Sequence, residues 1–192
     1  MAAATALMMN GDGSIEKITT RAIAEQAGVG VGLVNYHFQN KDRLIELCVQ
    51  RIIADVIGGF EPPLKGGSGP ERLKATAKAV FDFLMENPAV SRISILGDFR
   101  APEAEDNTMR TAAGFLATAG VDSPEYRAAA FALTSTMQGA FLRREDGKAC
   151  MGYDIRIKEE RDACIDFLAD ALFGEAGKFT VEKGGADREG TE

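Results

Sequence analysis

The side chains with the clearest chemistry lie between residues 19 and 44, which read TTRAIAEQAGVGVGLVNYHFQNKDRL. Thr20, Arg21 and Lys41 stand in the first turns of expected helices, where a hydroxyl, a guanidinium and an ammonium group can bind a phosphate. Asn35 can form two hydrogen bonds with the edge of an adenine. These residue types together predict contact with both the backbone and the base edges of double-stranded DNA.

Two short helices and a longer one must position these groups. Hydrophobic spacing predicts them over residues 20–27, 31–37 and 41–57. Gly28 stands where the chain has to reverse between the first two helices, and Val29 is expected to fill the gap between them. This layout is typical of a helix-turn-helix, whose second helix can enter the major groove of DNA. A plain corner of two packed helices has the same spacing and is the alternative.

The same stretch resembles the DNA-binding segment of the TetR/AcrR family of bacterial helix-turn-helix transcriptional regulators. The positions in register with that family's pattern are Thr20, Ile23, Ala24, Ala27, Gly28, Val29, Gly32, His37, Phe38, Lys41 and Leu44. The resemblance implies a homodimeric repressor that binds a near-palindromic operator. It further implies that the operator is released when a small molecule enters a second domain.

The residues expected to bind DNA combine phosphate contacts with base contacts. They are Thr20, Arg21, Gly30, Val31, Gly32, Leu33, Asn35, Tyr36, His37 and Lys41. Val31 and Leu33 suit contact with thymine methyl groups, and the family resemblance makes the Tyr36 hydroxyl a phosphate contact. The structural alternatives are a helix cap for Thr20, a solvated charge for Arg21 and a half-buried aromatic ring for Tyr36.

Several features depart from the family's pattern. Gly30 stands where a serine is usual, and Asn35 stands where an aromatic residue is usual. Residues 1–50 carry four basic and five acidic side chains, whereas DNA-binding domains are usually basic. Because the first expected helix, residues 2–9, is also very short, we hypothesise that the native N-terminus is longer than Met1. A same-fold ligand-binding protein with impaired or lost operator binding is the alternative function.

Composition excludes several classes of protein. The 192 residues are 45% hydrophobic and carry a net charge of −7, which indicates a globular protein whose DNA binding must come from a local patch. No stretch approaches the roughly 18–20 consecutive apolar residues of a membrane span. Three cysteines without C-x-x-C spacing indicate reduced core thiols, and we expect a bacterial cytoplasmic protein that joins the nucleoid when bound to DNA.

Catalytic chemistry is not expected. The sequence has no nucleotide-binding glycine pattern after a strand, no nucleophile motif and no cluster with metal-ligand spacing. His37 is the only histidine, and it is expected to pack or to contact a phosphate. We therefore predict no enzyme activity, no cofactor and no metal.

Outside the glycine- and proline-rich stretch at 58–70 and the glycine-rich end from residue 174, the spacing is helical, so the expected fold class is all-α. We expect a three-helix DNA-binding domain at residues 1–45, a helical ligand-binding and dimerisation domain at 46–173, and a mostly disordered tail at 174–192. Beyond the helix-turn-helix, the expected helices cover residues 71–86, 89–96, 108–119, 123–144 and 154–173. The last two have broad apolar faces and are expected to form a four-helix dimer interface; two ordinary core helices are the alternative.

Phenylalanine and methionine side chains supply much of the apolar bulk of the second domain. The candidates for binding an effector are Phe81, Met85, Phe99, Met109, Phe115, Phe131 and Met137. Side chains at such helical spacing also form plain cores. If they line a cavity, the adaptable methionines would suit a small apolar effector, whose identity no residue reveals.

Overall fold

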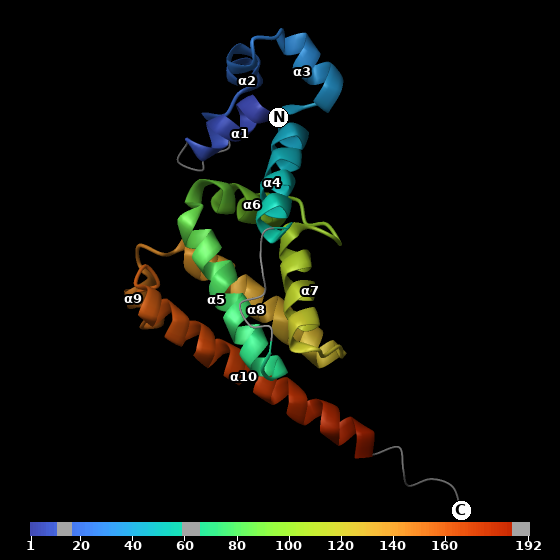
Figure 1. Ribbon diagram of the computed structural model, residues 1–192, viewed down its shortest axis with the longest axis vertical. Helices are drawn as coiled ribbons and strands as arrows, with labels where there is room; N and C mark the ends of the chain where they lie inside the picture. The colour runs from blue at the N-terminus through green and yellow to red at the C-terminus, as the bar shows by residue number, and fades with distance from the viewer. Residues whose placement is uncertain (11–16, 59–65, 186–192) are drawn as a thin grey trace, which may run out of the picture. The chain divides into compact units, whose positions relative to one another are not determined.

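The computed structural model describes residues 1–10, 17–58 and 66–185 (Figure 1). Within these ranges the chain forms ten α-helices and no strand, which confirms the all-α fold class. The chain divides into two compact units. The first comprises Met1–Glu61 and Leu84–Glu103, and the second comprises Pro62–Phe83 and Ala104–Glu192.

The first unit is built around one small apolar core. Its helices are α1 (Ala2–Met9), α2 (Thr20–Ala27), α3 (Val31–Phe38), α4 (Lys41–Gly58) and α6 (Pro88–Arg100). The core includes Met8 from α1, Ile23 from α2, Val34 from α3 and Leu44 from α4. Ile93 of α6 joins the same core, so this unit includes a helix that the sequence division at residue 45 placed in the second domain.

Local signals set the ends of the helices around the turn. The Thr19 hydroxyl caps α2 by accepting a hydrogen bond from the Ala22 N–H at 3.1 Å. Gly28 ends α2 in the left-handed region at φ 67°, a conformation that favours glycine. The Asn40 side chain caps α4 by accepting from the Arg43 N–H at 2.8 Å. These short-range interactions explain why the predicted helix starts match those observed.

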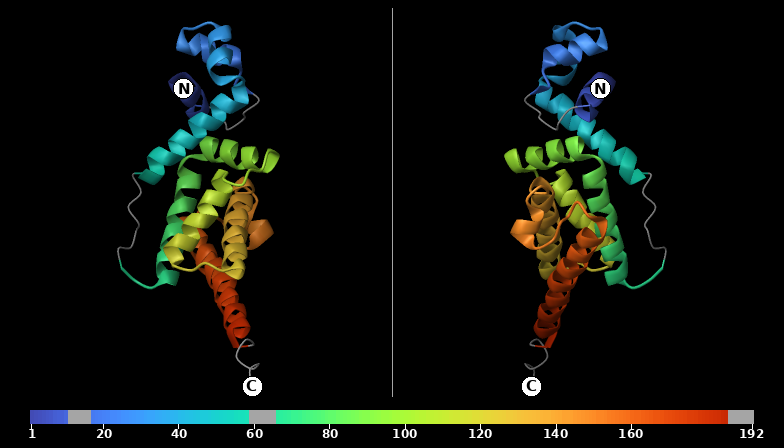
Figure 2. Two further views of the ribbon diagram at one scale, coloured as in Figure 1. Left: turned by 90° about the vertical axis from the view of Figure 1, so that its right-hand side faces the viewer. Right: turned by 90° about the vertical axis from the view of Figure 1, so that its left-hand side faces the viewer.

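The second unit contains α5 (Gly69–Glu86) as far as Phe83, and a group of helices around α8. These are α7 (Asn107–Ala119), α8 (Pro124–Leu142), α9 (Gly147–Met151) and α10 (Lys158–Gly185). α8 packs against both α7 and α10 (Figure 2). Its start follows the expected pattern, because the Ser123 hydroxyl accepts from the Tyr126 N–H and Pro124 occupies the first helical position.

Ion pairs join α5 to α10 along one line. The pairs are Lys74–Asp170 at 2.7 Å, Lys78–Asp166 at 2.8 Å and Lys158–Asp82 at 2.6 Å, with Arg161 also bonded to Asp82. The Arg161 side chain is only 7% exposed, and its guanidinium also donates to the Ile155 carbonyl. Burial by itself would raise the pKa of Asp82, but the hydrogen bonds from Lys158 and Arg161 outweigh it and lower that pKa.

Several expectations for the second half of the chain were wrong in detail. The last helix begins at Lys158 rather than at Asp154, because Asp154 is held in a preceding turn by Arg156. It continues to Gly185, so residues 174–185 are helical and not part of a disordered tail. Residues 186–192 of that tail lie outside the described residues.

Other local features were missed from the sequence. α9 had not been expected, and α6 runs on to Arg100. Cys48 and Cys164 are buried as expected, but Cys150 is exposed. In the described ranges, no helix combines the length and the hydropathy needed to cross a membrane.

Candidate nucleic-acid interface

α3 presents one side to the core and the opposite side to solvent. Val34 is buried at 6% exposure and anchors the inner side. Successive residues of a helix are about 100° apart, so Gly32 and Tyr36 point most directly away from Val34. Leu33 and Asn35 flank them on the two sides. Tyr36 is 82% exposed, Leu33 is 49% exposed and Asn35 is also exposed, so the outward face of α3 is a free surface of mixed polar and apolar groups.

One of the two central positions of that outward face, Gly32, carries no side chain. A Cβ atom added at Gly32 would meet no atom of the protein within 4 Å. Packing in the first unit therefore does not require a glycine here, although glycine weakens a helix. The missing side chain leaves the α3 backbone open to close approach by a partner.

The predicted phosphate-binding groups lie at the starts of α2 and α4. Because Thr19 supplies the α2 cap, the Thr20 hydroxyl is not the group that caps this helix. Arg21 is exposed in the first turn of α2. The Lys41 side chain, 25% exposed, lies 3.9 Å from Asp42 at the start of α4. Each helix start thus places one cation beside its terminal N–H groups, where the helix dipole favours an anion.

A second cation near α4 is neutralised within the protein. Arg43 forms an ion pair with Glu46 at 2.7 Å, and the hydrogen bond and charge of Glu46 raise the pKa of that guanidinium. This pair reduces the positive charge that the first unit can offer to a phosphate.

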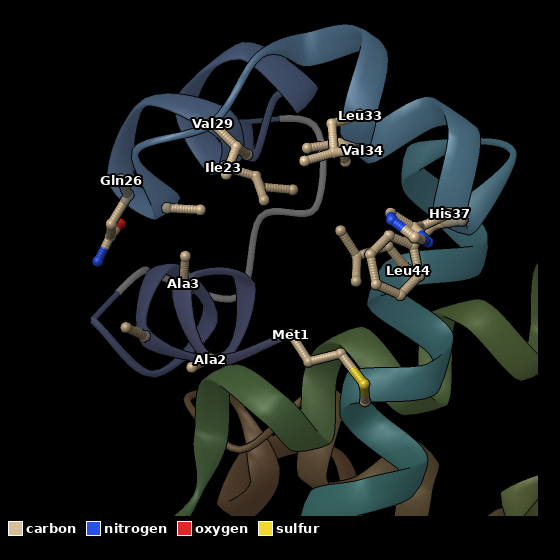
Figure 3. A pocket seen from close by; sticks show the side chains of 13 residues that line it. Met1, Ala2, Ala3, Ile23, Gln26, Val29, Leu33, Val34, His37 and Leu44 are labelled. Atoms are coloured by element: carbon tan, nitrogen blue, oxygen red, sulfur yellow. The ribbon is translucent and has the colours of Figure 1, made fainter.

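A groove of about 580 Å³ opens within the first unit, between α1, α2, α3 and α4 (Figure 3). Its lining includes Ala3 from α1, Ile23 from α2, Leu33 and His37 from α3, and also Val29. Val29 is 39% exposed, so the expectation that it fills the gap between the helices was wrong. It lines the hollow instead, because the turn holds it beside α2 rather than deep between the helices.

An unusual turn joins α3 to α4. Gln39 has φ 65° and ψ −52°, and the Asn40 N–H donates to the Phe38 carbonyl at 2.7 Å. This is the geometry of a strained three-residue γ-turn. Since this turn directly precedes the Asn40 cap, it sets the direction of α4 relative to α3.

The residues predicted to bind an effector fall in both units. Met85 and Phe99 belong to the first unit, and the other five belong to the second. Phe81, Phe115 and Met137 are each 1% exposed and form part of the core of the second unit. The remaining two, Met109 and Phe131, are 40% and 48% exposed. The structure therefore separates them into core and surface residues.

The apolar surface of α8 and α10 differs from the stripe read in the sequence. The expected stripe of α8, which includes Leu133, Met137 and Phe141, is buried inside the second unit. Among the side chains that the structure describes on these two packed helices, the large apolar ones that remain exposed are Phe131 on α8 and Phe167 on α10. Phe167 is 60% exposed and was not singled out from the sequence, because its position on the outer side depends on how α10 is packed.

Among the residues that the structure describes, no three histidine, cysteine or acidic side chains gather as a metal site. The surface of the first unit that carries the predicted DNA-binding groups is the outward face of α3 together with the starts of α2 and α4.

A family model describes the part of the chain that carries this surface. Residues 2–48 match the model of the bacterial regulatory proteins of the tetR family. The chain is similar in fold to a TetR transcriptional regulator from Rhodococcus sp. RHA1, with a TM-score of 0.62 and 19% identity, covering 90% of this chain and 91% of that one. A TetR-family transcriptional regulator from Rhodococcus sp. has a TM-score of 0.53 and 22% identity, covering 89% and 94% of the two chains.

Curated relatives match over a shorter stretch. The nucleoid occlusion factor SlmA of Actinobacillus pleuropneumoniae serotype 5b (strain L20) is 26% identical over 87 residues, which are 45% of this chain and 43% of that protein. SlmA of Glaesserella parasuis serovar 5 (strain SH0165) is 22% identical over 86 residues. The match thus spans less than half the length of these relatives.

Proposed function

We propose that this chain, whose residues 2–48 match the model of the bacterial regulatory proteins of the tetR family, is a dimeric, DNA-binding transcriptional repressor. It acts in the bacterial cytoplasm and leaves a near-palindromic operator when a small apolar effector binds. The observation that carries the proposal is the outward face of α3, which is exposed, lacks a side chain at Gly32 and follows the left-handed turn at Gly28. A second helix presented in this way is what a helix-turn-helix inserts into the major groove.

The proposed docking gives each helix a separate role. α3 lies in the major groove, with Val31, Leu33 and Asn35 against base edges and Gly30 and Gly32 allowing close approach. The first helix of a helix-turn-helix crosses the backbone, so Thr20 and Arg21 contact phosphates. Lys41, His37 and the Tyr36 hydroxyl bind phosphates on the other side of α3. The proposed DNA-binding surface contains few cations, in line with the net charge of −1 over residues 1–50.

The proposed dimer forms through the outer sides of α8 and α10. Phe131 and Phe167 are large, apolar and exposed on two helices that pack side by side, and small residues such as Ala128, Ala132 and Ala163 are exposed or half-buried on the same helices. Two copies of this pair would form a four-helix interface. Replacing Phe167 by arginine should convert the dimer to a monomer in sedimentation velocity. A Phe167→Arg variant that remains dimeric would contradict this interface.

The proposed effector acts through the second unit. The candidate residues there include the buried Phe81, Phe115 and Met137, which an apolar ligand would contact if it entered the core between α7 and α8. A ligand that binds one conformation of the dimer better than another shifts the population toward it. Two recognition helices must lie roughly 34–36 Å apart to reach successive major grooves, so a change in their separation weakens binding to the operator.

The experiment that tests the regulator function is fluorescence anisotropy with the full chain. The DNA is the duplex upstream of its own coding sequence, compared with a scrambled duplex across a salt series. Selective, salt-sensitive binding to the upstream duplex would support the proposal. Equal binding to both duplexes, or none at low salt, would contradict it and favour a ligand-binding protein of the same fold that has lost its operator.

Two variants separate backbone contacts from base contacts. Lys41→Ala should weaken binding to every duplex alike and reduce the salt dependence by about one phosphate contact per protomer. Asn35→Ala should cost about 1–3 kcal/mol at particular base pairs only. If both variants bound the operator like the wild type, the proposed docking of α3 would be wrong.

A further inference from the structure

α3 has a composition that restricts which bases it can read. Its eight residues, VGLVNYHF, contain no lysine, arginine, aspartate or glutamate. The exposed side chains in its first five residues are Val31 at 40%, Leu33 at 49% and Asn35. The N-terminal residues of a recognition helix are the ones that contact base edges, so these three side chains supply the chemistry available there.

Each base presents a different partner chemistry in the major groove. Guanine is read chiefly by arginine or lysine, and cytosine by acidic side chains that accept from its amino group. Adenine is read by asparagine or glutamine, and thymine by apolar contact with its 5-methyl group. α3 therefore offers one adenine reader and two partners for thymine methyl groups, and no charged group for guanine or cytosine.

The geometry of the outward face supports contact with adjacent base pairs. Leu33 and Asn35 lie on opposite flanks of Gly32, whose Cα faces open space. A backbone that approaches closely at Gly32 would bring an apolar side chain to one neighbouring base pair and an amide to another. Leu33 and His37, which is in the last turn of α3, both line the groove within the first unit. The 49% of Leu33 that stays exposed is the part available to a base pair.

The nearby cations lie on other helices. Arg21 is on α2, the helix that crosses the backbone in this motif. Arg43 is on α4 and is paired with Glu46 at 2.7 Å, and Lys41 also belongs to α4. These positions suit phosphates, which carry no base identity, so they do not replace the guanine reader that α3 lacks.

We infer that each operator half-site read by α3 is an A·T-rich tract, recognised through thymine 5-methyl groups at Val31 and Leu33 and through one adenine edge at Asn35. This inference rests on the proposed function, since it describes the DNA that the same surface binds. It makes the methyl group of thymine a principal determinant of specificity.

The first test is selection of duplexes from a randomised pool by the full chain. An enriched half-site of adenine and thymine supports the inference, whereas an enriched half-site centred on guanine and cytosine overturns it. A pool that shows no enrichment at low salt contradicts the proposed function itself and the inference with it. The two failures are therefore distinguishable in one experiment.

The second test removes single methyl groups from the selected duplex. Replacing thymine by deoxyuridine should weaken wild-type binding by about fourfold for each methyl group that α3 contacts. Leu33→Ala should lose this sensitivity at one position of the half-site. Asn35→Ala is the matched control: it should keep the methyl sensitivity but lose about five- to 150-fold preference at one adenine. Unchanged wild-type affinity for the deoxyuridine duplex would overturn the inference.

Discussion

Gly32→Ala tests the placement of α3 by separating stability from DNA binding. The added Cβ would meet no protein atom within 4 Å, and alanine is favoured over glycine inside a helix by at most about 1 kcal/mol. The variant should therefore be slightly more stable than the wild type. If the face around Gly32 lies against the bases, the same methyl group overpacks the complex, which costs about 1–3 kcal/mol per half-site. A dimer would then bind about 30-fold more weakly or worse.

The assay pairs chemical denaturation with anisotropy on the operator duplex, and the chain offers a matched control. Gly114 is exposed within α7 of the second unit, and a Cβ there also meets no atom within 4 Å. Gly114→Ala should give a comparable gain in stability with unchanged DNA binding. Wild-type affinity for the Gly32→Ala variant would refute the close approach of α3 to DNA. A loss of stability in that variant would instead refute the packing argument.

Further perturbations test the electrostatics and the turn. Glu46→Gln should release Arg43 from its ion pair, tighten binding to all duplexes and steepen the salt dependence by about one contact per protomer; an unchanged slope would contradict this. Asp82→Asn should destabilise the second unit by up to about 3 kcal/mol, because it leaves a buried guanidinium without its carboxylate, whereas Asp170→Asn on the exposed pair should cost less than about 1 kcal/mol. Since the folded pKa of Asp82 is lowered from 3.8, the stability that its ion pair contributes should be complete at neutral pH and be lost as the pH falls below that value. Equal losses of stability in Asp82→Asn and Asp170→Asn at pH 7 would refute the distinction between a buried and an exposed ion pair. Gln39→Gly should stabilise the first unit by about 1 kcal/mol by relieving the positive φ, and no gain in denaturation would show that the turn is unstrained.

The sequence by itself determined the helix-turn-helix and the ends of its helices. These depend on interactions between residues close along the chain, such as the Thr19 and Asn40 caps and the left-handed Gly28. Residue types also pointed to the candidate DNA-binding set, because hydrogen-bonding and charge chemistry belong to the side chain itself. The amide of Asn35, proposed to read adenine, and the ammonium of Lys41, proposed to bind a phosphate, are of this kind.

The tertiary structure decided which of these groups are presented and which are buried. Only packing shows that Val34 turns inward, that Val29 lines a groove, and that α6 completes the core of the first unit through Ile93. In the same way, the apolar stripe of α8 became core, and Phe167 emerged on the outer side of α10. A helical pattern states that one side is apolar, but which neighbour covers that side depends on residues distant in the sequence. The physical reason is that burial is a property of contacts between elements and not of any single segment.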